Sequence, residues 1–302
     1  MERRQYVKSI VSYPDRGPYG DPRWRGNTSG RLIKDLLLYF RPALCCDPMQ
    51  GSGTTGDVCK ELGIRYVGLD LHSGFNIIKD SIIERIKESP DYFFLHPPYH
   101  DVIKYSGSVW GDNPHPDDLS HCHSPEEFLD KLQSALYNVY DALAGNGHYS
   151  VLIGDIRRQN TFWSIQADVI KMGPGVLESV VIKEQHNCMS DKTVYSGRFV
   201  PIVHEYLLNF KKDRLVFGFL DAAVKTSQGL VALSNATWRA VVEWTLRKLG
   251  GKANLSEIYS AVAEKAQEKI KANPNWQAKV RQVLQKYASN VEWGVWAIRK
   301  AA

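Results

Sequence analysis

A turn stiffened by two prolines is the first feature of the sequence that could do chemistry. Residues 95–101 read LHPPYHD and follow an apolar run. Because proline fixes φ and lacks an N–H group, Pro97 and Pro98 cannot continue a central strand. Such a turn leaves main-chain carbonyls free as acceptors. It also holds Tyr99 at the carboxyl end of a strand, the edge at which open α/β sheets bind ligands. A polar loop that contains two prolines is the plainer alternative.

A glycine-rich loop precedes this turn. Residues 46–63 read CDPMQGSGTTGDVCKELG. The glycines permit a tight turn in which backbone N–H groups approach a ligand, and the following helix N-terminus favours negative charge. No Lys-Ser/Thr pair follows as in a Walker P-loop, and the segment departs from the dinucleotide G-x-G-x-x-G pattern. Asp70, 23 residues after Asp47, ends the next apolar run, where a carboxylate can accept hydrogen bonds from ribose hydroxyls. The glycines alone also fit a purely structural turn.

Strands and helices alternate along the first two thirds of the chain and must position these two segments. Residues 10–30 are expected to form a loop. The alternation predicts an α/β fold with a mostly parallel sheet covered by helices on both faces. Apolar runs predict strands at 43–48, 65–71, 91–96, 148–156, 176–184 and 204–212, and amphipathic stretches predict helices at 31–40, 56–63, 81–88, 124–147 and 161–173.

The pattern changes after residue 212. Helices are expected at 235–251, 254–272 and 275–289, followed by a short aromatic, β-prone end at 291–300. Three helices with such an end predict a small domain of the winged helix-turn-helix type. We therefore divide the chain into a first domain at 1–212, a linker at 213–233 and a helical domain at 234–302.

Composition sets broad limits on the class of protein. The chain has 302 residues, a net charge of +5 and five cysteines, two of them adjacent. An odd cysteine count does not suggest a disulfide framework, no run is long enough for a membrane span, and the first residues lack the apolar core of a signal peptide. We expect a cytoplasmic protein without membrane contact, and the mild positive charge is compatible with nucleic-acid binding.

The segments DPMQGSGTTG and HPPY together resemble the S-adenosylmethionine-dependent DNA amino-methyltransferases, which modify adenine N6 or cytosine N4. The resemblance spans about residues 10–212 and implies a Rossmann-like class I methyltransferase fold, with S-adenosylmethionine as cofactor. It implies that the base is flipped out of double-stranded DNA. The implied cofactor-binding residues are Asn27, Ser29, Asp47, Pro48, Gly51, Ser52, Gly53, Thr54, Thr55, Asp70 and Asp80.

The resemblance also assigns the proline turn. An exocyclic amine is a poor nucleophile because its lone pair is delocalised into the ring, and acceptors for its N–H groups help it to rehybridise. The implied catalytic residues are His96, Pro97, Pro98 and Tyr99, with Tyr99 stacking on the base. The family usually carries Asp, Asn or Ser where this chain has His96, yet a neutral imidazole can still accept one hydrogen bond. We favour adenine N6 slightly over cytosine N4.

Basic residues suggest where DNA is contacted. On the helix at 275–289, polar residues lie beside an apolar face, as on a helix that reads the major groove. A solvated helix face or a protein contact is the alternative. The candidate DNA-binding residues are Arg157, Arg158, Lys192, Arg198, Gln277, Lys279, Arg281, Gln282, Gln285 and Lys286. The segment NPHPDDLSHCHS (113–124) contains metal-ligand residue types, but its HCH run cannot easily aim all side chains at one ion, so we expect no metal and a loop beside the target pocket.

These features predict a site-specific DNA methyltransferase of the restriction-modification or orphan type. The alternatives are a non-catalytic DNA-binding regulator on a methyltransferase scaffold, and an RNA or protein methyltransferase. A homodimer and a cognate restriction endonuclease are both compatible with this prediction.

Overall fold

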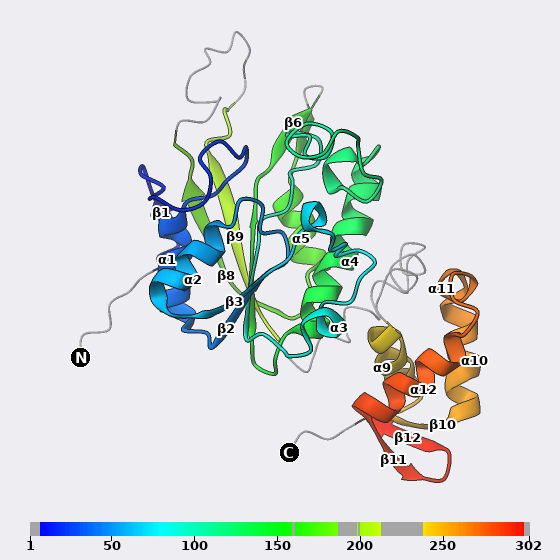
Figure 1. Cartoon of the computed structure of the whole chain (residues 1–302). Coiled ribbons are helices and arrows are strands. Elements are labelled where there is room, and N and C mark those ends of the chain that lie inside the picture. The colour runs from blue at the N-terminus through cyan, green and yellow to red at the C-terminus, as the bar shows by residue number, and fades with distance from the viewer. Residues whose placement is uncertain (1–6, 159–160, 187–197, 199, 213–237, 299–302) are drawn as a thin grey trace.

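A computed structural model describes residues 7–158, 161–186, 198, 200–212 and 238–298. Over these ranges the chain forms an α/β domain up to residue 212 and a smaller C-terminal module at 238–298 (Figure 1). The predicted linker at 213–233 and the exact boundary between the two domains lie outside the described residues. Among the described residues, no helix is long and apolar enough to cross a membrane.

One seven-stranded sheet forms the centre of the α/β domain, in the order β1-β8-β9-β5-β4-β2-β3. Strand β9 runs antiparallel to both of its neighbours, whereas all the other pairings are parallel. The predicted α/β fold class with a mostly parallel sheet is therefore confirmed. The strands are β1 (Ile10–Ser12), β2 (Leu44–Asp47), β3 (Arg65–Gly68), β4 (Tyr92–Leu95), β5 (His148–Ile153), β8 (Val176–Glu184) and β9 (His204–Lys211).

Helices cover both faces of this sheet. Helices α1 and α2 pack with one set of sheet residues, and α3, α4 and α5 pack with the other (Figure 1). Neighbouring residues Phe93 and Phe94 of β4 belong to opposite cores, as the two-residue period of a strand requires. The helices are α1 (Gly30–Phe40), α2 (Thr54–Leu62), α3 (Ile82–Ile86), α4 (Pro125–Ala142) and α5 (Ile165–Met172), with 3₁₀ turns η1 (Leu71–Ser73) and η2 (Leu119–His121).

Two local predictions in this domain were wrong. Ile10–Ser12, expected to be loop, forms the edge strand β1 beside β8. The sequence did not indicate it because a three-residue strand is too short to show alternation. The helix expected at 161–173 begins only at Ile165. Before it, the β-prone residues of β7 (Thr161–Trp163) pair with β6 (Ile156–Arg158) in a separate hairpin.

The C-terminal module has its own core and its own sheet. Side chains such as Val241, Ile258 and Leu284 pack together in that core, and three strands form an antiparallel sheet in the order β10-β12-β11. The helix expected at 254–272 is divided at Ala266. The elements are α9 (Trp238–Lys248), β10 (Lys252–Asn254), α10 (Leu255–Lys265), α11 (Gln267–Lys271), α12 (Trp276–Tyr287), β11 (Ala288–Glu292) and β12 (Val295–Ile298).

The module is attached to the carboxyl-terminal end of α4. Tyr137 of α4 is buried in the module's core, and the Arg239 guanidinium donates to the Asp141 carbonyl oxygen at 3.1 Å. Because α4 runs antiparallel to the strands that flank it, the module lies near the amino ends of the parallel strands (Figure 1).

Candidate active site

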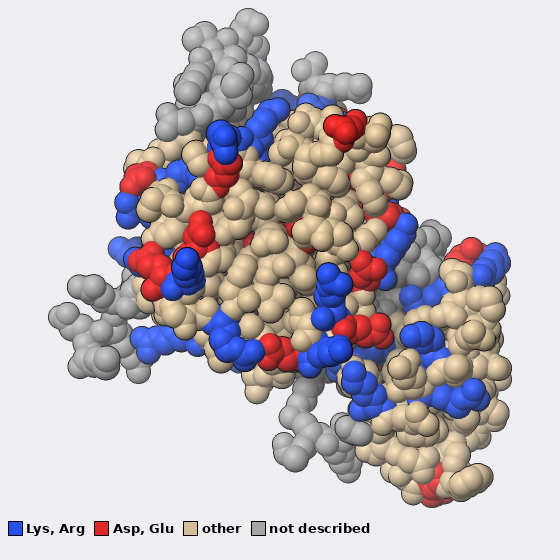
Figure 2. Space-filling model, viewed as in Figure 1, with Lys and Arg blue, Asp and Glu red and all other residues tan. Residues whose placement is uncertain are grey.

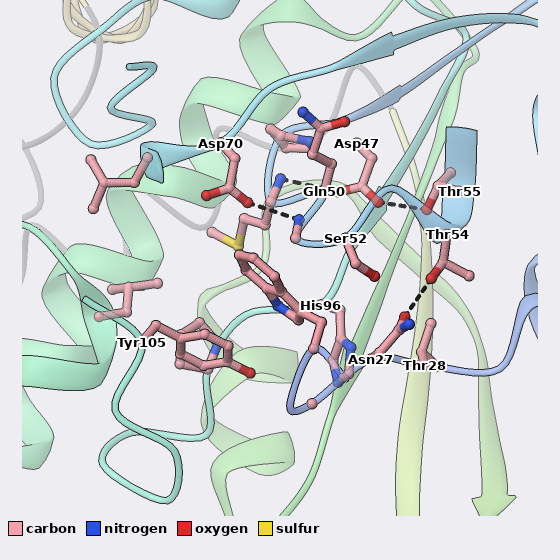
Figure 3. Close-up of a pocket in the computed structure, with 18 of the residues that line it drawn as sticks. Asn27, Thr28, Asp47, Gln50, Ser52, Thr54, Thr55, Asp70, His96 and Tyr105 are labelled. Carbon is pink, nitrogen blue, oxygen red and sulfur yellow. Dashed lines mark hydrogen bonds between the residues drawn. The ribbon is translucent and has the colours of Figure 1, made fainter. Parts of the chain in front are cut away.

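A pocket of about 850 Å³, including the part open to solvent, lies at the carboxyl ends of β2, β3 and β4. Its position is typical of ligand sites in open α/β sheets. Asp47, Asp70 and His96 lie around it in Figure 3, each from a different strand end. Aromatic side chains from two loops, Trp24 and Tyr105 among them, form another wall.

The glycine loop brings backbone N–H groups to the floor of this pocket. Gly51 and Gly53 have φ of 51° and 86°, the left-handed region that favours glycine. The turn is closed by the Gly53 N–H, which donates to the Gln50 carbonyl at 2.8 Å. The hydroxyl of Thr54, at the start of α2, donates to Asn27, which joins the loop to the segment before α1 (Figure 3).

Asp47 is a buried carboxylate at the end of β2, only 3% exposed. It accepts hydrogen bonds from the Thr55 hydroxyl at 2.5 Å and the Met49 N–H at 3.0 Å. No cationic side chain pairs with it in the described part of the chain. Burial raises the pKa of Asp47 to about 7, although the hydrogen bonds from Thr55 and Met49 lower it. A cation on the pocket side of Asp47 would stabilise the charged carboxylate.

Asp70 links the end of β3 to the glycine loop. One carboxylate oxygen accepts from the Gly51 N–H at 2.9 Å, and the other accepts from the His72 N–H at 3.1 Å. The His72 ring lies 2.8 Å from this carboxylate, and the contact raises the pKa of His72. The carboxylate still lines the pocket and keeps lone pairs for a ligand.

Two hydroxyl groups in the pocket wall have no partner among the described residues. The Oγ1 atom of Thr28 and the Oγ atom of Ser52 are buried without a hydrogen bond, and both residues line the pocket (Figure 3). Buried hydroxyls without partners are costly, so they indicate a polar ligand. The sequence analysis did not identify Thr28, because an isolated threonine carries no signal. Ser29, predicted beside it, occupies the N-cap position of α1 without a side-chain capping hydrogen bond and does not line the pocket.

The proline turn places His96 and Pro98 in the wall of the same pocket, with Pro97 and Tyr99 behind them. The Tyr99 ring packs against Gly154, where an added Cβ would come within 2.7 Å of the ring. Its hydroxyl donates to Glu205 at 2.6 Å. This tyrosine is thus fixed at its hydroxyl end, and its predicted stacking on a base stays a prediction.

Two buried charges behind the turn were not identified from the sequence. Lys183 and Glu205 are 9% and 6% exposed, and they pair at 2.6 Å. Burial alone would raise the pKa of Glu205, but Lys183, His96 and hydrogen bonds from Lys183 and Tyr99 hold it below its usual range. Burial lowers the pKa of His96 despite the attraction of Glu205. His96 is therefore neutral at neutral pH.

Asp80 does not line this pocket, and its contact with the cofactor stays a prediction. One of its carboxylate oxygens accepts from the Asn76 N–H at 2.8 Å, and it lines a cleft between the α/β domain and the module. The residues before it, 77–79, form a turn. Asp117 and Asp118 from the loop at 113–124 line the pocket instead. Gly53 is also absent from the pocket wall; its part is to start α2.

The loop at 113–124 forms part of the pocket wall. The Asp118 carboxylate accepts from the N–H and hydroxyl of Ser106 at 2.8 and 2.6 Å and from the Ser120 N–H at 2.8 Å. Among the described residues, no three metal-ligating side chains gather at one point. Asp118 thus joins this loop to Ser106, and Asp117 joins it to Asn76 at 2.8 Å and to Lys79 at 2.6 Å.

The candidate DNA-binding residues fall into three places. Arg158 of β6 pairs with Asp101 at 2.5 Å, next to the proline turn, and Arg157 lies over the Phe162 ring at 5.6 Å. Arg198 is exposed, and Lys192 lies outside the described residues.

The polar residues predicted to contact DNA on α12 lie on two different faces of this helix. Those that line the cleft between domain and module are Lys279, Gln282 and Lys286. Those that are exposed away from the cleft are Gln277, Arg281 and Gln285. Figure 2 shows Lys and Arg side chains on both sides of this cleft.

Comparison with protein-family models and with curated proteins finds no match. Among solved structures, TrmN from Thermus thermophilus is 15% identical over 63% of this chain and 50% of its own, with a TM-score of 0.35. A proposed DNA modification methylase, also from Thermus thermophilus, is 18% identical over 47% of this chain and 50% of its own, with a TM-score of 0.28. The N-methyltransferase NodS from Bradyrhizobium japonicum, in complex with S-adenosyl-L-homocysteine, is 13% identical over 63% and 76%, with a TM-score of 0.32.

The chain spans half the length of the first two of these proteins. TM-scores this low give no support for any particular function of this chain.

Proposed function

We propose that the chain transfers a methyl group from S-adenosylmethionine to an exocyclic amino group of a DNA base, with adenine N6 slightly favoured over cytosine N4. One observation carries this proposal. A single pocket contains both the glycine loop with its buried, unpaired carboxylate and the proline turn with its neutral imidazole. The first part fits a cationic nucleoside, and the second offers hydrogen-bond acceptors to an amine.

The groups in the pocket fit S-adenosylmethionine, which supplies a methyl group bound to a positively charged sulfur. Asp47 lacks a cationic partner among the described residues, and the amino group of the methionine part would provide one. Ser52 and Thr28 have buried hydroxyls free to donate to its carboxylate. Asp70 lies where ribose hydroxyls can donate to it. The fit thus rests on groups that the protein alone leaves unpaired or only partly paired.

The proline turn would act on the other reactant. The carbonyl oxygens of Pro97 and Pro98 accept no hydrogen bond from the described main chain, and His96 lies beside them in the pocket wall. Acceptors at this point favour the rehybridised amine, whose nitrogen then bonds to the methyl carbon as the bond from carbon to sulfur breaks. The surplus amine proton leaves to solvent. The base must first leave the duplex, which costs a few kcal/mol.

The C-terminal module is proposed to be a winged helix-turn-helix that contacts DNA. Its elements follow the order helix, strand, two helices, helix and hairpin, and the exposed face of α12 carries Gln277, Arg281 and Gln285. These side-chain types contact phosphates and base edges. Arg158, near the proline turn, is a further candidate for phosphate contact.

The proposal is tested by methyl transfer from radiolabelled S-adenosylmethionine to DNA, RNA and protein in parallel. We expect label in DNA, and its loss in a His96→Ala variant that still binds the cofactor. Long-read sequencing of the labelled DNA identifies the base and the site. Label confined to RNA or protein would correct the substrate. Cofactor binding without transfer to any of the three would indicate a non-catalytic regulator.

A further inference from the structure

Four side chains form a continuous hydrogen-bonded line from the sheet to the proline turn. Lys183 and Glu205 are directly paired residues of the antiparallel strands β8 and β9. The Lys183 ammonium donates to one oxygen of Glu205 at 2.6 Å, and the Tyr99 hydroxyl donates to the other at 2.6 Å. The Tyr99 oxygen lies 2.9 Å from Nε2 of His96. The line ends at the pocket, because His96 is part of its wall.

The position of each hydrogen in this line follows from its chemistry. A lysine ammonium only donates, so Glu205 beside it is a carboxylate and only accepts. The single hydrogen of the Tyr99 hydroxyl must then point to Glu205, since two oxygens 2.6 Å apart repel without a hydrogen between them. The Tyr99 oxygen can therefore only accept from His96. It follows that Nε2 of His96 carries a hydrogen.

This leaves the other ring nitrogen of His96 with a free lone pair. Burial lowers the pKa of His96, so the ring carries one hydrogen and not two. Within the described residues, Nδ1 has no hydrogen-bond partner, and it is not among the polar atoms sealed from solvent without one. An imidazole has one donor and one acceptor nitrogen, so only a fixed tautomer gives it a defined function.

We propose that Lys183, Glu205 and Tyr99 are positioning residues that fix His96 in the Nε2–H tautomer and thereby make Nδ1 the acceptor for one N–H of the target amine. This inference rests on the proposed function. It explains why a carboxylate–lysine pair is buried behind the turn of this chain. A carboxylate in place of His96 would accept hydrogen bonds in any orientation and would need no such line.

The test uses the full chain labelled with ¹⁵N-histidine. The nitrogen resonances of His96, assigned by their loss in His96→Ala, should show a protonated Nε2 and an unprotonated Nδ1. Tyr99→Phe keeps the ring that packs on Gly154 but removes the acceptor for Nε2–H. We expect mixed tautomers in this variant, with unchanged cofactor affinity. Its kcat should fall about tenfold to a hundredfold, the size of effect that misplacement of a reacting group produces, with little change in KM for DNA.

Tyr206→Phe is the matched control. The Tyr206 hydroxyl is also 2.9 Å from a histidine nitrogen, that of His204, but neither residue lines the pocket. This variant should transfer methyl groups at the parental rate.

The outcomes separate the inference from the proposed function. A protonated Nδ1 in the parent protein overturns the inference whatever the activity, and so does a parental kcat in Tyr99→Phe. A parent protein that shows the expected tautomer but methylates no nucleic acid confirms the hydrogen-bonded line and refutes the proposed transfer to a DNA base.

Discussion

The Asp47 carboxylate should lower the stability of the free protein at pH 8 and raise its affinity for the cofactor. Burial raises the pKa of this carboxyl from 3.8 to about 7. A group whose pKa is raised by folding holds its proton more tightly in the folded state. As the pH rises from about 4 to about 7, the unfolded chain releases this proton before the folded protein does. The free energy of unfolding therefore falls over this range. Because an asparagine side chain does not titrate, Asp47→Asn should remove this loss.

The size of the effect follows from the shift. A difference of about 3 pKa units corresponds to about 4 kcal/mol of stability at pH 8. Asparagine can keep its oxygen toward the Met49 N–H, but its NH₂ group then faces the Thr55 hydroxyl in place of the second oxygen, and loss of the bond to a charged carboxylate costs about 1–3 kcal/mol. The net gain at pH 8 is then about 1–3 kcal/mol, or roughly 3–10 °C in Tm for a domain of this size. At pH 5 only about 2 kcal/mol of the loss has developed, so the gain and the cost nearly cancel and the variant should be about as stable as the parent.

Thermal melts at pH 5 and pH 8 without ligand measure the first part, and calorimetric titration with S-adenosylmethionine at pH 8 measures the second. The variant should bind the cofactor roughly ten- to a hundredfold more weakly, because a hydrogen bond to a charged group contributes about 1.5–3 kcal/mol. Asp91→Asn is the control: its carboxylate accepts from the Ala43 and Leu44 N–H groups at the other end of β2, and cofactor affinity should be unchanged. A difference in Tm that does not depend on pH would refute the reasoning, and an unchanged affinity in Asp47→Asn would refute the pairing with the ammonium.

Three further substitutions test other parts of the site and the module. Asp70→Ala should weaken cofactor binding far more than DNA binding in calorimetry and gel shift, and an equal loss of both would indicate misfolding. Gly154→Ala should push the Tyr99 ring aside and lower methyl transfer while cofactor affinity is kept; a parental rate would show that the ring position is unimportant. Arg281→Gln should reduce the salt dependence of DNA binding by about one ion, whereas Lys279→Gln, which faces the cleft, should change it less. Equal effects would mean that the exposed face of α12 is not the contact surface.

The glycine loop and the proline turn could be predicted because each is formed by consecutive residues. Gly51 and Gly53 set a tight turn, Pro97 and Pro98 end a strand, and Asp70 follows a strand of its own. Parallel strands bring their carboxyl ends to one edge, so the alternation of elements was enough to place these residues together.

Residues that act across the sheet could not be predicted. Lys183 and Glu205 read as ordinary charges on strands, and only the antiparallel pairing of β8 with β9 brings them face to face behind the turn. The position of Asp80 could not be predicted either, because its place in a sequence motif gives no information about the turn before it. Asp80 lines the cleft and not the pocket. The two faces of α12 likewise depend on where the module docks.

That docking position limits how DNA can be handled. The pocket and the cleft beneath the module have no lining residue in common, although Lys79 of the cleft pairs with Asp117 of the pocket at 2.6 Å. Because the exposed face of α12 is turned away from this cleft, a duplex contacted there would lie apart from the base being modified. The proposed module would then serve as a tether rather than as a reader of the target site. A tether raises the local concentration of neighbouring sites without choosing among them. If the module acts as a tether, the protein should methylate several sites on one DNA molecule before release, and the α/β domain alone should set their sequence context.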